Sequence, residues 1–335
     1  MKSGSFILLI GVFFLASGCS GEPGPKEGPM ASTTVSNHIS LLPETTHLLI
    51  YANVKSLKQT PFGQGLGEQW DPNIRRDQDD EEYREFKEYT GFVFERDVNE
   101  IWISGGSKDD SGDHKGGAIV RGQFDQDKIA DYAKNQRRQS LAEQEFEGHK
   151  IYVSEKENGD LAFAFLDAET ALVGSEQWIK TVILQTKTGK SVTDNPNMSK
   201  FLSQIPNKDY FWGVVDMGGN GWAENLRKHG SPFKGAESLE KMKSLVFYAK
   251  VGQRAEVIMK GDFTTAEEAE MFADMLNGFK AMAKMMVSDD KEAIDMLNEI
   301  RIKTAGADLE LTMNLDKDFF DKWEQKRRKF EKIEL

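Results

Sequence analysis

Val120-Arg-Gly-Gln-Phe-Asp125 is the stretch that decides the predicted fold, because its pattern returns later as Met259-Lys-Gly-Asp-Phe-Thr264. In both, a hydrophobic residue precedes a basic residue, a glycine, a polar residue, a phenylalanine and a helix-capping residue. The alternation over Ala118–Phe124 is typical of a half-buried strand, and Asp125 can cap a following helix. The recurrence therefore indicates an internal duplication.

Other predicted strands follow the same order in each copy. In the first copy these are His47–Val54 and Val98–Ser104, and in the second they are Tyr210–Asp216 and Ser244–Val251. At the end of each copy, Leu309, Leu311 and Met313 repeat the alternation of Leu161, Phe163 and Phe165. We expect an α+β fold made of two copies of a β-α-β-β-α-β-like unit, with antiparallel sheets covered by helices on one face. The spacing leaves open whether the copies form one continuous sheet or two domains.

The chain divides into four predicted parts. Residues 1–18 read as a lipoprotein signal peptide and residues 19–38 as a Pro/Gly/Ser-rich tether. The first α+β repeat is expected over residues 39–206 and the second over residues 207–335. Within the tether, the eighteen residues Ser20–Asn37 have a mean reach of roughly 20–25 Å, so the tether would hold the folded part close to a membrane.

The amino terminus carries the features of an export signal. Lys2 precedes Phe6–Ala16, an apolar run too short to span a bilayer as a stable helix. Small residues then lead into Cys19, the sole cysteine of the chain. This stretch resembles the lipobox of bacterial lipoproteins, in which Leu normally stands at the position of Ala16. The alternative is an ordinary secretory signal with an incidental cysteine.

The resemblance implies that Cys19 is acylated and becomes the mature amino terminus. Several acyl chains anchor a protein stably, at about 0.8 kcal/mol per buried methylene. The expected location is the cell envelope, with the membrane as a partner through the acyl chains. Ser20 after the cysteine resembles an outer-membrane address, facing the periplasm, in a cell with two membranes.

Composition excludes several classes of protein. Hydrophobic residues make up 39% of the chain, with 21 Phe and 6 Trp, which is enough for sizeable cores. The formal charge is −12, and an acidic surface disfavours nucleic acid as a partner. Because Cys19 is the sole cysteine, the ectodomain has neither an internal disulfide nor a thiolate zinc site.

Four motifs resemble those of a group of uncharacterised exported bacterial proteins. They are Leu57…Thr60-Pro-Phe-Gly63, Tyr89-Thr-Gly-Phe92…Glu95-Arg-Asp97, Val120–Asp125 and Glu169-Thr-Ala-Leu-Val-Gly-Ser175. The chain departs from that group at Val93-Phe94, where Asp-Pro is frequent. The likeness covers most of residues 40–200. This resemblance implies an exported, duplicated α+β domain. It assigns no activity and no catalytic residues to this chain.

We predict no catalytic residue, metal site or cofactor. The histidines are His38, His47, His114, His149 and His229. None has the i,i+2 or i,i+4 partner of a metal site, and no HExxH motif exists. Ser175 follows a lone glycine rather than a GxSxG elbow, so we interpret it as a helix cap.

The segment from Thr265 to Ile300 is the main candidate for binding. Thr265 and Glu268 form a predicted capping box, and six of the thirteen methionines lie between Met271 and Met296. A helical pair covering the sheet is one interpretation. The other is an adaptable apolar groove for a lipid tail or a partner helix, because methionine surfaces repack around varied ligands. The candidate face comprises Phe272, Met275, Phe279, Met282 and Met286.

Together these features predict a lipid-anchored exported protein that acts as a non-enzymatic binding or envelope-assembly module, with a protein or a lipid as its partner. The alternative is an envelope hydrolase or transferase with an unrecognised active site. Converging polar side chains in one cleft would favour that alternative.

Overall fold

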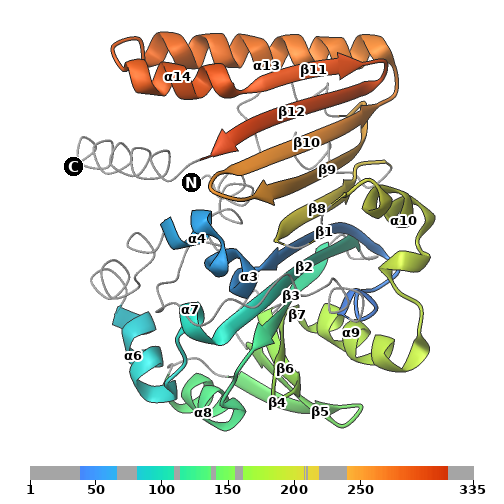
Figure 1. The fold of residues 1–335 in the computed structure, drawn as a ribbon. Coiled ribbons are helices and arrows are strands. Elements are labelled where there is room, and N and C mark those ends of the chain that lie inside the picture. Colours follow the sequence, from blue (N-terminus) through green and yellow to red (C-terminus); the bar gives the residue numbers. More distant parts are fainter. Residues whose placement is uncertain are drawn as a thin grey trace.

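A single antiparallel sheet of twelve strands forms the centre of the molecule (Figure 1). The computed structural model describes residues 38–65, 81–108, 114–136, 141–154, 161–206, 208, 210–218 and 240–315. The predicted signal peptide and nearly all of the predicted tether lie outside these ranges. The strand order is β11-β12-β10-β9-β8-β1-β2-β3-β7-β6-β5-β4.

The strands fall into two sequential groups. The first comprises β1 (Thr46–Asn53), β2 (Val98–Lys108), β3 (His114–Gly122), β4 (Leu141–Phe146), β5 (His149–Ser154), β6 (Leu161–Asp167) and β7 (Thr170–Ser175). The second comprises β8 (Phe211–Asp216), β9 (Met242–Val251), β10 (Ala255–Phe263), β11 (Arg301–Ala305) and β12 (Asp308–Leu315).

Helices lie between these strands. The earlier ones are α3 (Val54–Gln59), α4 (Pro61–Gly65), α6 (Glu81–Thr90), α7 (Phe94–Asp97) and α8 (Gln126–Asp131), which continues into the π-helical turn η2 (Tyr132–Gln136). The later ones are α9 (Glu176–Thr188), the 3-10 turn η3 (Val192–Asp194), α10 (Pro196–Ser203), α13 (Ala266–Met286) and α14 (Lys291–Glu299). The predicted α+β class is confirmed.

The two groups of strands meet at the middle of the sheet, where β1 pairs with β8. The pairing is antiparallel, with Ile50 opposite Gly213 and Tyr51 opposite Trp212. This pairing answers the question that the spacing left open, because the strands of both groups belong to one continuous sheet.

The order of strands on either side of this pair shows the duplication. Outward from the centre run β1-β2-β3-β7-β6 on one side and β8-β9-β10-β12-β11 on the other. Strand β12 is therefore the counterpart of β7, so the match of Leu309–Met313 to Leu161–Phe165 was wrong. Both strands alternate, and alternation alone cannot tell which member of a hairpin lies next to the neighbouring strand.

Two strands were not predicted, and both lie at an edge of the sheet. Strand β11 is largely exposed, and β4 is exposed at three of its six positions. Edge strands of this kind lack the regular apolar alternation that identifies a strand in a sequence. Strands β4 and β5 pair as an added hairpin of the first group.

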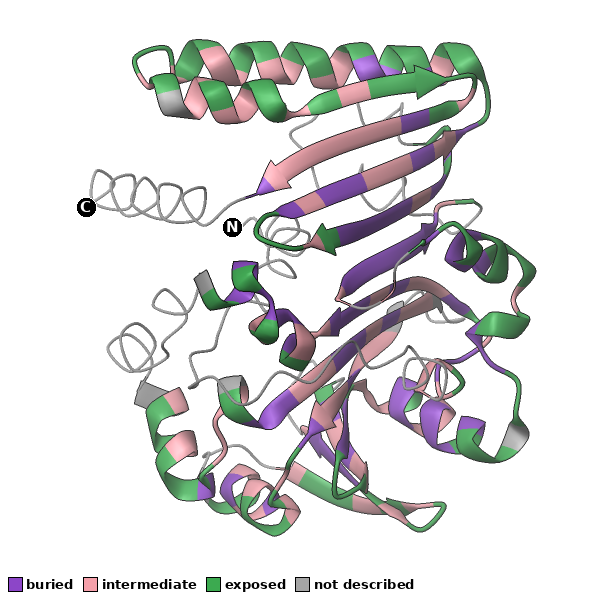
Figure 2. Ribbon diagram, viewed as in Figure 1, coloured by how far each residue is buried: buried purple, intermediate pink, exposed green. Residues whose placement is uncertain are grey.

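Helices cover both faces of the sheet, in place of the single face that was expected. On one face, Leu49, Tyr51 and Trp212 pack beneath α9 and α10. On the other, Leu57 of α3 and Phe62 of α4 pack against the central strands, and α13 packs against β10 and β12. The central strands explain this arrangement, because β8 is buried at all six of its positions and needs cover on both sides (Figure 2).

Three aromatic side chains join the two copies at the centre of the core. The ring centroid of Tyr51 lies 4.4 Å from that of Trp102 and 5.5 Å from that of Trp212. The two indoles meet edge to face at 5.8 Å. Since Tyr51 and Trp102 belong to the first copy and Trp212 to the second, the copies share one hydrophobic core.

Candidate functional site

Helix α13 is the longest helix of the described residues, and its predicted start is confirmed. The Thr265 hydroxyl accepts a hydrogen bond from the Glu268 backbone N–H, and the Glu268 carboxylate accepts one from the Thr265 N–H. This capping box satisfies two backbone donors at the amino end of the helix. The first turns of α13 then pack through Phe272, whose ring centroid lies 5.3 Å from that of Phe263 on β10.

The structure divides the predicted apolar face of α13 in two. Phe272 is buried, and Met275 and Phe279 are half-buried, so this part of the face covers the sheet. Met282 and Met286 are 52% and 86% exposed. Figure 2 shows the same division, with the buried residues of α13 confined to its amino-terminal half.

The exposed methionines of α13 form one stripe. The methionine stripe, as we name it here, consists of Met271, Met282, Met285 and Met286, and Met271 and Met285 are 58% and 76% exposed. Met282 follows Met271 by eleven residues, about three helical turns, and Met285 follows it by fourteen, nearly four turns, so Met271 lies on the same side of the helix as the carboxyl-terminal members. The predicted face did not include Met271 and Met285. The density of methionine between residues 271 and 296 was the sequence signal that could have identified them.

Helix α14 folds back beside the carboxyl-terminal half of α13. Asp290 caps this helix, because its carboxylate accepts a hydrogen bond from the Ala293 N–H at 2.9 Å. The Lys280 ammonium donates to the Ile300 carbonyl and so links α13 to the end of this hairpin. Burial, and secondarily the nearby charge of Lys284, lowers the pKa of Lys280.

Apart from α13, a cluster of polar side chains lies where β1 and β8 meet α10. His47 Nδ1 is 3.8 Å from an Asp216 carboxylate oxygen, which also accepts a hydrogen bond from the Asn197 amide at 3.1 Å. The other oxygen of Asp216 accepts from the Gly218 N–H at 3.0 Å. Ser244 is buried and lies opposite Asp216 in the sheet. Sequence reasoning missed this cluster, because its members are far apart along the chain.

His47 and Asp216 do not complete a catalytic triad. Within the described ranges, His47 Nδ1 makes no hydrogen bond. No group of three or more His, Cys, Asp or Glu side chains among the described residues could hold a metal ion. The Asn197 amide and the Gly218 N–H therefore satisfy the buried Asp216 carboxylate, and the described residues of the cluster place no hydrogen-bonded nucleophile beside His47.

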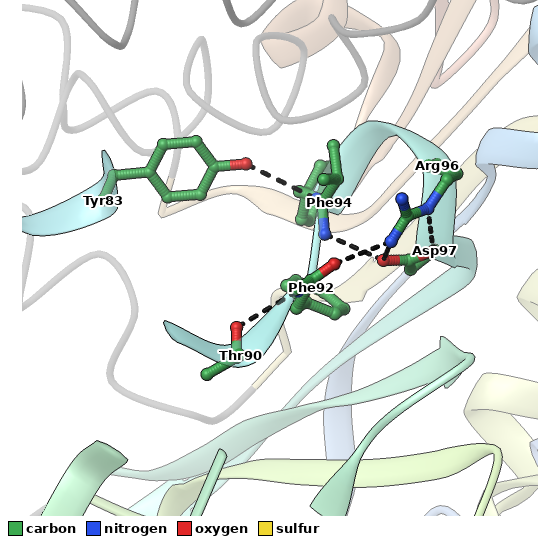
Figure 3. Close-up of polar contacts among 8 residues, drawn as sticks. Tyr83, Thr90, Phe92, Phe94, Arg96 and Asp97 are labelled. Atoms are coloured by element: carbon green, nitrogen blue, oxygen red, sulfur yellow. Dashed lines mark hydrogen bonds and ion pairs between the residues drawn. The ribbon is translucent and has the colours of Figure 1, made fainter. Parts of the chain in front are cut away.

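The motif Tyr89-Thr-Gly-Phe92…Glu95-Arg-Asp97 forms the corner between α6 and β2 (Figure 3). The buried Asp97 carboxylate accepts hydrogen bonds from the Val93 N–H at 2.8 Å and from two nitrogens of the Arg96 guanidinium. Arg96 also donates to the Gly91 carbonyl at 2.7 Å. Gly91 has a φ of +72°, which favours glycine. The motif thus holds a chain reversal together.

Cys19, the predicted lipidation site, lies outside the described residues. In the described part of the chain, no helix is long and apolar enough to cross a membrane.

Comparisons with known proteins give distant alignments with solved structures. No protein-family model matches the chain, and no curated protein sequence matches it. Crystal form III of the protein TP0453 aligns with a TM-score of 0.47 at 9% identity, over 84% of this chain and 95% of that one. Crystal form I of the same protein aligns with a TM-score of 0.40 at 8% identity, over 84% and 94% of the two chains.

Proposed function

We propose that this chain is a lipid-anchored protein of the bacterial cell envelope that acts as a non-enzymatic binding or assembly module. The observation that carries the proposal is the position of Cys19, the sole thiol, at the end of the apolar run Phe6–Ala16 and directly after small residues. A thiolate is nucleophilic enough to accept a diacylglyceryl group, and the neighbouring residues match the lipobox pattern.

The methionine stripe is the surface that this module would present. Its four side chains are more than half exposed, although such side chains are normally placed where they can be buried. Flexible methionine side chains adapt to apolar partners of varied shape. An adaptable apolar surface near a membrane supports binding in preference to chemistry, and the partner would be a protein or a lipid.

Metabolic labelling tests the anchor. Cells that express the full chain are given a fatty-acid probe, and we expect the wild-type protein to be labelled and to sediment with membranes. Cys19→Ser removes the acceptor thiol and should abolish the labelling. Equal labelling of both proteins, or a precursor that stays in the cytosol with its leader uncut, would overturn the proposal.

Site-specific photo-crosslinking tests the binding surface. A photoreactive amino acid at Met282 should capture an apolar partner in intact cells, whereas the same amino acid at Asn277, an exposed position away from the stripe, should not. Equal capture at the two positions would remove the stripe as the binding surface.

The cluster at His47 carries the second candidate function, an envelope hydrolase or transferase. The 3.8 Å approach of His47 to Asp216 is the observation in its favour. Activity-based probes for serine and cysteine hydrolases should then label the wild type and fail to label His47→Ala. We expect neither protein to be labelled.

A further inference from the structure

The methionine side chains of the described residues differ sharply in their exposure to solvent. Every described methionine that is more than half exposed lies on α13 and belongs to the methionine stripe. Met198 and Met242 lie in the core, at 0% and 5% exposed. The others are half-buried, and they are Met217, Met259, Met275, Met296 and Met313. The stripe is therefore the place where a dissolved molecule has the freest access to methionine sulfur.

Apolar character alone does not explain methionine at the four positions of the stripe. Leucine has a similar volume and an equally good helix propensity, and the two residues replace each other at little cost. Methionine differs from leucine in its flexibility and in its thioether sulfur, which oxidants convert to a sulfoxide. A sulfoxide is polar, so a methionine side chain is apolar or polar according to its oxidation state.

Three of the four sulfurs of the stripe lie close together on α13. Met282 precedes Met285 and Met286 by three and four residues, so the three side chains are neighbours on the helix surface. Gly278 and Ala281, each four residues before one of these methionines, are exposed and uncharged. Oxidation of the three thioethers would place polar sulfoxide oxygens across this apolar area, and such groups favour water over an apolar partner.

We propose that the methionine stripe is a reversible oxidation site, and that a peroxide switches this surface from apolar to polar. With hydrogen peroxide, the thioether sulfur attacks one oxygen, the O–O bond breaks, and the sulfur loses two electrons. The proton left on the transferred oxygen passes to the departing hydroxide, which leaves as water. In the reverse reaction two thiols become a disulfide, and the sulfoxide oxygen leaves as water. The effect on binding rests on the proposed function, because the stripe is the surface used there.

The cysteine content makes thioethers the available sulfur targets in the mature protein. A thiolate is a strong nucleophile and reacts readily with peroxides. Cys19 is the sole cysteine, and its acylation in the proposed function leaves the mature chain without a free thiol. A peroxide that reaches the anchored protein therefore meets methionine sulfur, and it meets the exposed sulfurs of α13 first.

Peptide mass mapping tests the oxidation site. Membranes that contain the full chain are treated with a graded series of hydrogen peroxide, and each methionine is assayed for one added oxygen atom. We expect the stripe to be oxidised at least about tenfold faster than the buried Met198 and Met242. Methionine sulfoxide reductases A and B with dithiothreitol should then restore the thioethers. Equal rates at exposed and buried methionines, or sulfoxides that the reductases leave in place, would overturn the proposal.

Thermal unfolding separates a change of surface from a change of fold. The side chains of the stripe project from the core, so oxidation of all four should move the unfolding midpoint by less than about 4 °C. Loss of the cooperative transition after selective oxidation of the stripe would show that oxidation acts by unfolding the protein, and it would contradict a switch confined to the surface.

Matched variants test the effect on binding. With the photoreactive amino acid at Met282, peroxide added before illumination should lower the capture of the partner at least about fivefold. Met271→Leu, Met285→Leu and Met286→Leu together keep the surface apolar and remove its sulfurs, so this triple variant should capture equally with and without peroxide. Glutamine at the same three positions supplies a polar side chain of similar length and should lower capture without peroxide. Equal losses after peroxide in the wild-type background and the leucine variant would contradict the switch.

The two measurements distinguish this inference from the proposed function. If the amino acid at Met282 captures nothing before peroxide is added, the proposed binding surface is wrong, and mass mapping with its reversal decides the oxidation site. If a partner is captured and full oxidation of the stripe leaves the capture unchanged, the switch is wrong and the binding surface stands.

Discussion

The indole of Trp178 on α9 occupies the space that a side chain at Gly117 on β3 would need. A Cβ built on Gly117 would lie 2.4 Å from the nearest atom of the indole ring. The indole N–H donates to the Ser104 hydroxyl at 3.4 Å, and this hydroxyl is 2.9 Å from that of Thr46. Because Gly117 has no side chain, α9 can lie directly on the sheet at this point of β3.

Gly117→Ala should destabilise the protein by about 1–3 kcal/mol, because the added methyl group forces apart α9 and β3. In a strand without such a contact, the same change would be favourable. The measurement is thermal or urea unfolding. Gly252→Ala is the control, because a Cβ there has no atom within 4 Å, and it should be nearly neutral. Equal effects of the two changes would contradict this account.

Asp97→Ala should cost about 1–3 kcal/mol, because it leaves the Val93 N–H and the Arg96 guanidinium without their acceptor in the corner shown in Figure 3. Arg96→Ala should cost less than about 1 kcal/mol, since the Arg96 side chain is 66% exposed. Urea unfolding of the two variants measures the difference. A larger loss in Arg96→Ala would mean that the guanidinium, and not the buried carboxylate, holds the corner.

Removal of residues 207–335 should prevent folding of the first copy. Without β8, strand β1 becomes an edge, and Tyr51 loses its contact with Trp212. We expect the remaining fragment to lack a cooperative thermal transition in circular dichroism, and the whole chain to melt in a single transition. Independent folding of residues 39–206 would show that the shared core is not required.

The stability that Glu176 contributes should depend on pH. Its hydrogen bond with Lys180, the larger cause, lowers the pKa of the Glu176 carboxyl below the ordinary value of 4.5. A lowered folded-state pKa gives stability that is present above the unfolded-state pKa and is lost as pH falls through the folded-state pKa.

Glu176→Gln should therefore be less stable than the wild type by about 0.5 kcal/mol near neutral pH, and the difference should shrink below pH ~4.5. Urea unfolding over a pH series measures it, with Gln177→Ala as an exposed control on the same helix. A difference that persists unchanged into acid would contradict an origin in the ion pair.

Local features of the fold were predictable because they depend on neighbours in the chain. Ser175 accepts a hydrogen bond from the Trp178 N–H, as its position after a strand and before an apolar helix indicated. Asp125 caps α8 by accepting a hydrogen bond from the Lys128 N–H, as predicted. The end of α8 was not predictable in the same way, because the chain passes into a π-helical turn at Tyr132.

The sequence by itself determined the class of the fold, the capped helices and the methionine-rich segment, since each depends on residue spacing within a few turns or along one strand. Tertiary structure alone decided that the copies share one sheet through β1 and β8, that helices cover both of its faces, and that β12 rather than β11 lies beside β10. It also decided which methionines of α13 stay exposed. These outcomes depend on pairings between residues far apart in the chain, and an alternating pattern is compatible with several such pairings.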